Sequence, residues 1–391
     1  MTIVLTGGGS GGHITPILAV ARELKRRQPT VKLVYIGQTG DSLGDIPAKD
    51  SNIDEVYTIR AGKFRRYHGE GLKQLLDIKT TLKNMRDAVY VLIGIWQSYR
   101  LLKRLQPSTI FIKGGFVGVP VGLAAAKLRI PFITHDSDAI PGLANKIVGR
   151  WAARHAVALP ADVYPYPPES TVTTGIPLRE DFEPVTDELR SKYRLQLKLP
   201  ANSKILFVIG GGLGSQRVNQ AVAEAVPHLL REFSDLHVLQ AGGRSNEADL
   251  SREYDEVLSD RERSRLKVLG YVEDVYLYSG AANLIITRAG ATNLAEFALQ
   301  AKACLVIPSP FLAGGHQLKN AAYLEEQGAA VVLEEDDLLN DPHRLAKQVS
   351  HLLKDDKALN KLAAKLADFA KPNATHDLSD LILEQARQHE V

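Results

Sequence analysis

The sequence predicts an α/β protein of two Rossmann-like domains, whose parallel sheets face a cleft. Three observations predict it. Short β-branched runs alternate with helical patterns twice along the 391 residues, a glycine-rich loop follows the first strand of each series, and a proline-rich stretch separates the two series. Alternating strands and helices are typical of βαβ units, and therefore of a parallel sheet covered by helices on both faces. The length is sufficient for two such domains.

The elements follow in chain order. In the first series we expect strands at 3–5, 31–36, 109–112 and 132–134, and helices at 14–27 and 119–128. In the second series we expect strands at 205–209, 236–241, 284–286, 304–307 and 330–333, and helices at 218–233 and 294–300. These predictions rest on hydrophobic periodicity and on turn residues at the ends of each run.

The domain boundary is placed in the stretch 160–184, which holds six of the nineteen prolines and should resist regular structure. We therefore expect an N-terminal domain at 1–183 and a C-terminal domain at 184–391. The final stretch, 355–388, is helical by pattern with a break at Pro372, and it is free to pack on either domain.

Apolar runs and the cysteine content restrict the class of protein. The chain starts directly with an apolar run and glycines, so we expect a buried first strand and no signal peptide. No apolar run reaches the ~20 residues that cross a bilayer, so membrane contact should be peripheral. The single cysteine, Cys304, lies in an apolar run, which predicts a core residue in a reducing compartment.

The loop after the first predicted strand has five glycines in positions 7–12. Glycines let backbone N–H groups approach an anion or a sugar closely, and the next helix N-terminus adds partial positive charge. The loop also satisfies G-x-G-x-x-G, but a dinucleotide enzyme needs an acid at the end of the second strand, which here ends Tyr-Ile-Gly-Gln. This argues against a nicotinamide enzyme. His13, in the first helical turn, is favoured as a neutral imidazole and is a candidate general base.

Three segments of the second series carry the same kind of chemistry. The loop 210–215, GGGLGS, again joins a strand to a helix. The segment 287–296, TRAGATNLAE, offers a helix start to a phosphate, with Thr292 or Asn293 as its cap and Glu296 one turn further. Glu296 suits either two ribose hydroxyls or an ordinary first-turn charge. The loop 314–320, GGHQLKN, can offer two amide side chains to sugar hydroxyls.

Positive charge is concentrated in the segment 60–105, which has eleven Lys and Arg against three acids. Apolar residues interleave with these cations, which favours an interfacial element on an anionic membrane. A solvated helical face is the ordinary alternative. Nucleic-acid binding is not expected, because no recognised nucleic-acid module accompanies the charge.

Four ordered motifs together resemble the MurG family of glycosyltransferases, and the resemblance extends over nearly the whole chain. They are GGGSGGHITP at 7–16, KGGFVGVP at 113–120, HDSDAIPGLANK at 135–146 and TGIPLR at 174–179. The resemblance implies the GT-B fold, with an acceptor- and membrane-facing N-terminal domain and a C-terminal domain that binds UDP-N-acetylglucosamine. It implies transfer of N-acetylglucosamine to the 4-hydroxyl of lipid I, with inversion, in peptidoglycan synthesis at the cytoplasmic face of the cell membrane.

The resemblance also implies a set of site residues. For the donor it implies contact of the Val272 backbone with uracil and of Glu296 with ribose, and diphosphate and sugar contacts from Gly212, Arg288, Gly290, Ala291, Thr292, Gln317 and Asn320, with Arg179 approaching from the other domain. For the acceptor it implies Gly9, Ser10, Gly11, Gly12, His13 and Asn145. Asp138 stands where the family has asparagine and Gly212 where it commonly has serine, so His13 and Asp138 both remain candidate bases.

No cofactor and no metal are expected. Asp136-Ser137-Asp138 spells D-x-D, a metal signature of another glycosyltransferase fold, but it lies in the wrong domain for the donor. Loop amides and helix ends can offset the charge on departing UDP instead. The alternatives are the same fold acting on another lipid acceptor such as diacylglycerol, an epimerase of UDP-N-acetylglucosamine that releases free sugar, and a non-catalytic sugar-nucleotide-binding scaffold on the membrane.

Overall fold

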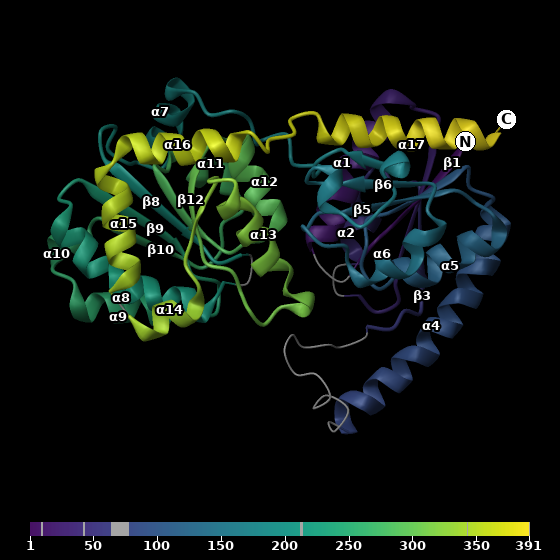
Figure 1. Ribbon diagram of the computed structural model, residues 1–391, viewed down its shortest axis with the longest axis horizontal. Helices are drawn as coiled ribbons and strands as arrows, with labels where there is room; N and C mark the ends of the chain where they lie inside the picture. Colours follow the sequence, from purple (N-terminus) through teal and green to yellow (C-terminus); the bar gives the residue numbers. More distant parts are fainter. Residues whose placement is uncertain (9–10, 42–43, 64–77, 212–213, 342, 391) are drawn as a thin grey trace. The chain divides into compact units, whose positions relative to one another are not determined.

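The computed structural model describes residues 1–8, 11–41, 44–63, 78–211, 214–341 and 343–390. The chain divides into two compact units, which are Met1–Arg179 with Lys371–Val391, and Glu180–Ala370 (Figure 1). Each unit contains one sheet in which every strand pairing is parallel. The predicted α/β fold with two parallel-sheet domains is confirmed.

The first unit has a seven-stranded sheet in the order β3-β2-β1-β4-β5-β6-β7. Its strands are β1 (Thr2–Thr6), β2 (Lys32–Gln38), β3 (Glu55–Ile59), β4 (Thr109–Ile112), β5 (Phe132–Asp136), β6 (Arg154–Val157) and β7 (Thr171–Thr173). Its helices are α1 (Gly11–Arg27), α2 (Asp45–Lys49), α4 (Ile78–Leu105), α5 (Gly118–Leu128), α6 (Leu143–Val148) and α17 (Ala374–Glu390).

The second unit has a six-stranded sheet in the order β10-β9-β8-β11-β12-β13. Its strands are β8 (Lys204–Ile209), β9 (Leu236–Ala241), β10 (Leu266–Leu269), β11 (Leu284–Thr287), β12 (Ala303–Val306) and β13 (Val331–Val332). Its helices are α7 (Asp187–Gln196), α8 (Gln216–Glu232), α9 (Glu247–Val257), α10 (Asp260–Arg263), α11 (Val275–Ala281), α12 (Ala291–Leu299), α13 (His316–Glu326), α14 (Glu335–Asn340), α15 (Arg344–Lys354) and α16 (Asp356–Ala367).

Each sheet separates two hydrophobic cores, because successive side chains of a strand point to opposite faces. In β1, Ile3 and Leu5 lie in one core and Val4 lies in the other. In β8, Leu206 and Val208 lie in one core, and Phe207 belongs to the second. Continuous apolar strands of this kind are buried on both faces, as parallel sheets require.

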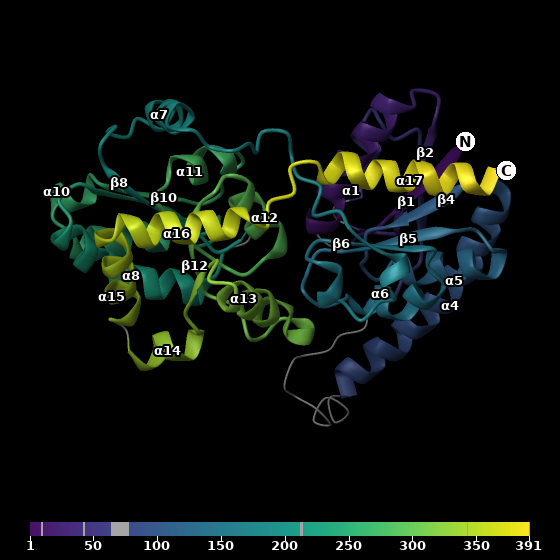
Figure 2. The same cartoon turned by 45° about the horizontal axis from the view of Figure 1, so that its top comes forward.

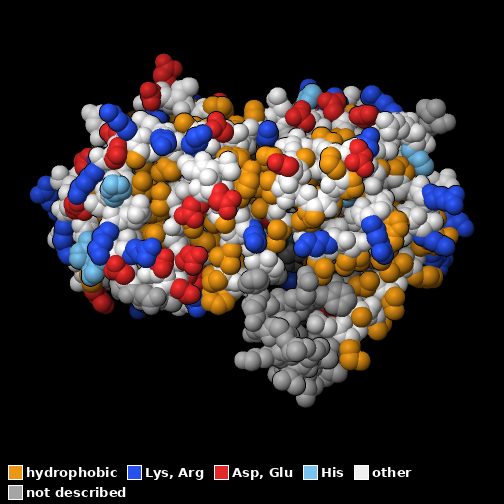
Figure 3. All heavy atoms as spheres, viewed as in Figure 1, with side chains coloured by type: hydrophobic (Ala, Val, Ile, Leu, Met, Phe, Trp, Pro, Cys, Tyr) orange, Lys and Arg blue, Asp and Glu red, His pale blue; other side chains and the backbone are white. Residues whose placement is uncertain are grey.

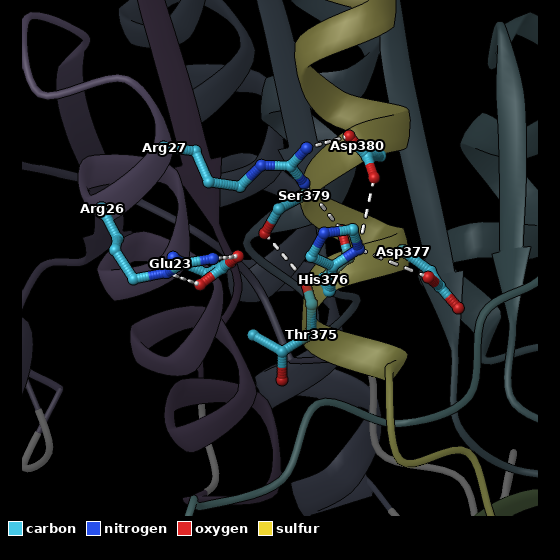
Figure 4. A network of polar contacts seen from close by, with 8 residues as sticks. All are labelled: Glu23, Arg26, Arg27, Thr375, His376, Asp377, Ser379 and Asp380. Carbon is cyan, nitrogen blue, oxygen red and sulfur yellow. Dashed lines mark hydrogen bonds and ion pairs between the residues drawn. The ribbon is translucent and has the colours of Figure 1, made fainter.

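The last helix, α17, packs on the first unit. It contacts α1 and β4, and both views show it lying along α1 (Figures 1 and 2). Leu378 and Ile382 of α17 share a core with Leu24 of α1. At the rim of this contact, Arg27 forms an ion pair with Asp380 and donates to the carbonyl of His376 at 3.2 Å (Figure 4). The C-terminal end of the chain therefore completes the N-terminal fold.

Two expectations about local structure have clear outcomes. The proline-rich stretch was expected to avoid regular structure, but it contains β7, an edge strand paired with β6. An edge strand needs partners on one side only, so nearby prolines are tolerated. Cys304 is buried in the core of the second unit, as predicted. Among the described residues, no helix is both long and apolar enough to span a membrane.

Candidate active site

The strand order of each sheet indicates one place, at the carboxyl ends of its strands, where a ligand can bind. In the first unit β1 lies between β2 and β4, and in the second unit β8 lies between β9 and β11. From each of these central strands, the chain first adds strands on one side of the sheet and then returns to add strands on the other side. The carboxyl ends of the β1–β4 and β8–β11 pairs are therefore topological switch points. Open α/β sheets bind their ligands outside such points. Each predicted glycine loop begins at a switch point.

His13 lies in the first turn of α1, directly after the first glycine loop. Its Nδ1 lies 3.1 Å from the carbonyl oxygen of Gly8, so that nitrogen carries the proton and Nε2 keeps its lone pair. Burial, and then the charge of Lys113, lower the pKa of His13 from 6.5 to about 4, against the opposing effects of the Gly8 bond and Asp138. The imidazole is therefore neutral near physiological pH, with Nε2 able to accept a proton.

Lys113, at the end of β4, is a buried cation in the same cluster. Its side chain is 3% exposed, and its Nζ donates to Ser137 Oγ at 2.6 Å. Burial lowers the pKa of Lys113 to about 8, and the charges of Asp136 and Asp138 oppose that decrease. The charge of Lys113 thus acts on the candidate base and interacts with two carboxylates.

Asn145, on α6, points to the same place as His13. A Cβ built on Gly114 would lie 3.7 Å from both His13 Nε2 and Asn145 Nδ2, so the two side chains converge there. Asn145 Nδ2 donates to the His135 carbonyl and to Asp136 Oδ1, each at 2.9 Å. Asn145 Oδ1 is buried and has no hydrogen-bond partner among the described residues. A buried amide oxygen of this kind is available to a ligand donor.

Asp136 ends β5 and fixes Asn145. Its Oδ1 also accepts from the Gly142 backbone at 3.0 Å, and its Oδ2 accepts from Tyr166 Oη at 2.7 Å. Burial raises the pKa of Asp136, while these donors oppose the increase. Tyr166 itself stacks on His155 with ring centroids 3.8 Å apart. A hydrogen-bond donor from the proline-rich stretch, Tyr166, thus supports the cluster around Asp136 and Asn145.

The remaining acceptor-side predictions have these positions. Asp138 is partly buried in the loop after β5, and its charge acts on both His13 and Lys113. Gly11 and Gly12 begin α1. Gly9 and Ser10 lie outside the described residues.

In the second unit, the N-terminus of α12 lies beside the second glycine loop. Gly290 is the N-cap, and Ala291 and Thr292 form the first turn, so the expectation that Thr292 or Asn293 caps the helix is wrong. Glycine has no side chain to occupy the first N–H groups, which leaves them to a ligand. No atom of the described residues would lie within 4 Å of a Cβ on Gly290. This helix end is therefore both uncapped by a side chain and sterically open.

Arg288 braces the loops at this switch point. Its side chain is 10% exposed, and it donates from Nη2 to Ser215 Oγ at 2.5 Å and from Nη1 to the Ile307 carbonyl at 3.1 Å. Ser215 is the N-cap of α8. Arg288 also forms an ion pair with Glu335. The guanidinium predicted to contact the donor is thus engaged by three loops of the protein.

Gln317 and Asn320 lie on the first turns of α13. The carbonyl oxygen of Gln317 accepts from the Ser309 backbone at 2.9 Å, which joins α13 to the loop after β12. Asn320 Nδ2 donates to the Ala289 carbonyl at 2.9 Å, which joins α13 to the loop before α12. These amides lie at the carboxyl edge of the sheet that carries Gly290.

The other residues predicted to contact the sugar nucleotide lie at separate places in the fold. Glu296 is partly buried on α12, and Val272 is a core residue after β10, consistent with a role for its backbone. Arg179 is exposed at the end of the first segment of the first unit. Gly212 lies outside the described residues.

Three residues of these clusters escaped sequence reasoning, namely Lys113, Tyr166 and Glu335. Lys113 belongs to the glycine motif 113–120. Its position directly after a buried strand could have identified it as a site residue. Tyr166 and Glu335 have no local signal, because their partners are 30 and 47 residues away. Among the described residues, no three His, Cys, Asp or Glu side chains gather as a metal site requires.

Two parallel-sheet domains, each with a glycine loop at its switch point, define the GT-B class of glycosyltransferases. Residues 3–157 match the glycosyltransferase family 28 N-terminal domain, and residues 205–378 match the family's C-terminal domain. The chain therefore belongs to glycosyltransferase family 28 and is a glycosyltransferase.

Relatives resemble the chain from end to end. A UDP-N-acetylglucosamine--N-acetylmuramyl-(pentapeptide) pyrophosphoryl-undecaprenol N-acetylglucosamine transferase of Natranaerobius thermophilus is 30% identical, covering 98% of this chain and 99% of that one. A similarly named transferase, number 3, of Bacillus thuringiensis is 34% identical, covering 92% and 93%. The crystal structure of Acinetobacter baumannii MurG matches with a TM-score of 0.73 and 25% identity, covering 98% and 99%.

Proposed function

We propose that the protein transfers N-acetylglucosamine from UDP-N-acetylglucosamine to the 4-hydroxyl of undecaprenyl-diphospho-N-acetylmuramyl-pentapeptide, lipid I, to give lipid II in peptidoglycan synthesis. The observation that carries the proposal is the end-to-end match to transferases named for this reaction. The geometry supports it, because a neutral base and an open helix N-terminus lie at the switch points of the two units.

The donor binds to the second unit. The diphosphate lies at the α12 N-terminus, where Gly290, Ala291 and Thr292 present backbone N–H groups and a partial charge of about +0.5. Glu296 accepts hydrogen bonds from the ribose hydroxyls, and the Val272 backbone contacts uracil. Gln317 and Asn320 contact the sugar from α13. These hydrogen-bond donors stabilise the additional negative charge that UDP carries as it leaves.

The acceptor reacts beside His13. Its 4-hydroxyl oxygen forms a bond to the anomeric carbon, while the bond between that carbon and the UDP oxygen breaks and UDP takes the electron pair. The hydroxyl proton passes to His13 Nε2, which is unprotonated because Nδ1 donates to Gly8. In-line attack inverts the anomeric configuration. Asn145, held by Asp136, orients the acceptor through its buried carbonyl oxygen.

The helix α4 carries the membrane contact. Met85, Val89, Leu92 and Trp96 are 62%, 53%, 67% and 58% exposed, and their spacing places them on one side of the helix. Figure 3 shows hydrophobic side chains gathered along the edge of the first unit that α4 occupies. We name Met85, Val89, Leu92 and Trp96 the apolar stripe.

Cations flank the apolar stripe on the same helix. Arg86, Arg100, Lys103 and Arg104 are exposed, and the Arg100 guanidinium lies 4.8 Å from the Trp96 ring centroid. Each cation near an anionic surface contributes about 1 kcal/mol to binding. The apolar stripe enters the lipid interface at the cytoplasmic face of the membrane, where the lipid-linked acceptor lies. The rest of the basic segment, 64–77, lies outside the described residues.

A reconstituted transfer reaction tests this proposal. Purified protein is incubated with labelled UDP-N-acetylglucosamine and lipid I in anionic vesicles, and UDP release and labelled lipid are measured. We expect both products, and we expect both to require lipid I. Label in diacylglycerol, release of free sugar without an acceptor, or UDP binding without turnover would replace this function by another lipid transferase, an epimerase or a scaffold.

A further inference from the structure

We propose that Glu335 is a positioning residue of the donor site, which holds the diphosphate-binding loops in place through two arginines. The inference rests on the proposed function and adds a residue to which no ligand contact is assigned. Glu335 is the first residue of α14 and is 5% exposed, yet it lies in a polar cluster at the carboxyl edge of the sheet.

The carboxylate bridges two guanidinium groups. Its Oε2 accepts from Arg217 Nη1 at 2.8 Å, and its Oε1 forms an ion pair with Arg288 Nη2. A buried carboxylate is costly unless it is paired. Oε2 accepts a hydrogen bond from Arg217, while Oε1 has the charge of Arg288 beside it but accepts no hydrogen bond from the described residues. The buried Glu335 carboxylate therefore contacts both guanidinium groups.

Each arginine connects Glu335 to a loop of the donor site. Arg288 reaches Ser215, the N-cap of α8, and the Ile307 carbonyl at the end of β12. Arg288 is also the second residue before Gly290, the N-cap of α12. The loops after β8, β11 and β12 thus meet at a single guanidinium.

Arg217 extends the network to the loop before α13. Its guanidinium lies 4.4 Å from the ring centroid of Phe311, which is 57% exposed. A cation over an aromatic face is an attractive contact. Phe311 belongs to the loop that leads to Gln317. Glu335 is therefore connected, through Arg217 and Phe311, to the turn that we propose contacts the sugar.

The effect of removing the Glu335 charge on UDP binding distinguishes a positioning role from a counter-ion role. If Glu335 acted only as a counter-ion, it would compete with the diphosphate for Arg288, and its removal would strengthen UDP binding. If Glu335 positions the loops, its removal leaves the buried guanidinium of Arg288 without its counter-charge, and the loops separate. The three contacts of Arg288 with the protein favour positioning, because both of its terminal nitrogens are engaged within the protein.

The test substitutes Glu335→Gln, which keeps the side-chain shape and removes its charge. Isothermal calorimetry with UDP should show binding weakened about tenfold, the scale of a lost charged hydrogen bond. In the transfer assay the KM for UDP-N-acetylglucosamine should rise by a similar factor, while the KM for lipid I should not change. A purely structural defect would raise both KM values, so this split is specific to positioning.

Asp337→Asn is the matched control, because Asp337 is on the same helix and pairs with Arg344 at the surface. It should leave UDP binding unchanged. A cavity of about 140 Å³ beside Glu335 and Arg217 has room for water, so the variant should fold. If Glu335→Gln nevertheless does not fold, Arg288→Lys serves instead, since one ammonium cannot reach Ser215, the Ile307 carbonyl and Glu335 together.

Equal or tighter UDP binding by Glu335→Gln, or by Arg288→Lys where that variant is used, would overturn the positioning role while leaving the proposed function intact. Wild-type protein that binds no UDP would instead contradict the proposed function, and this inference with it. The wild-type titration therefore separates the two failures.

Discussion

Tyr166 donates a 2.7 Å hydrogen bond to Asp136, across 30 residues of sequence, and Asp136 in turn holds Asn145 beside His13. This relationship gives the acceptor-side cluster its rigidity, because a buried carboxylate with three kinds of donor has one favourable orientation. It also makes an aromatic residue outside every recognised motif a determinant of the site.

Removal of the phenolic hydroxyl by Tyr166→Phe should therefore weaken both the fold and the reaction. Loss of a hydrogen bond to a charged group costs about 1.5–3 kcal/mol in the free energy of unfolding. Denaturant unfolding measures this loss, and kcat should decrease because Asn145 is less well held. Tyr164→Phe is the control, since the Tyr164 hydroxyl accepts a longer, 3.3 Å bond from the Leu159 backbone and makes no hydrogen bond to a carboxylate among the described residues. Equal effects of the two variants would exclude the specific role of Tyr166.

Substitution of the base should separate the two candidates. His13→Ala should lower kcat by about 100- to 10,000-fold, the range attributed to general-base catalysis. Asp138→Asn should reduce kcat much less, because Asp138 acts on His13 through its charge. Steady-state rates at saturating donor and acceptor measure both variants. Near-normal turnover by His13→Ala with an inactive Asp138→Asn would assign the base to Asp138.

The pH dependence of kcat should depend on Lys113. Wild-type activity should fall as the pH decreases through about 4, because His13 is then protonated and no longer accepts a proton. The charge of Lys113 lowers the pKa of His13, so Lys113→Met should raise that pKa and move the acid limb to higher pH.

An alkaline change in activity near pH 8, where Lys113 loses its proton, should disappear in the same variant. Lys127→Met is the control, because Lys127 is an exposed cation on the next helix. An acid limb that coincides in wild-type and Lys113→Met proteins would show that Lys113 does not tune the base.

The apolar stripe should decide membrane binding. The double variant Leu92→Ser and Trp96→Ser should bind anionic vesicles at least about tenfold more weakly, since each buried side chain contributes about 1.5–3 kcal/mol. Vesicle sedimentation measures the bound fraction. Leu195→Ser is the matched control, because Leu195 is 78% exposed on α7 of the other unit. Transfer to a short-chain, water-soluble acceptor should be unaffected, and undiminished vesicle binding would contradict the role of the stripe.

The sequence by itself determined the two parallel sheets, their central strands and both glycine loops. These features depend on local patterns: apolar runs such as 205–209 repeat over a few residues, and glycines follow them directly. His13 and Gly290 were found for the same reason, because their chemistry comes from a strand-to-helix turn that the sequence displays.

Only the tertiary structure decided which distant side chains meet. Tyr166 reaches Asp136 because β7 and its preceding turns fold beside β6, and Glu335 reaches Arg288 because α14 follows β13 at the sheet edge. Whether Thr292 caps α12 depended likewise on where the helix begins. The physical reason is that buried charges are paired through the packing of separate elements, and no short-range periodicity encodes which elements become neighbours.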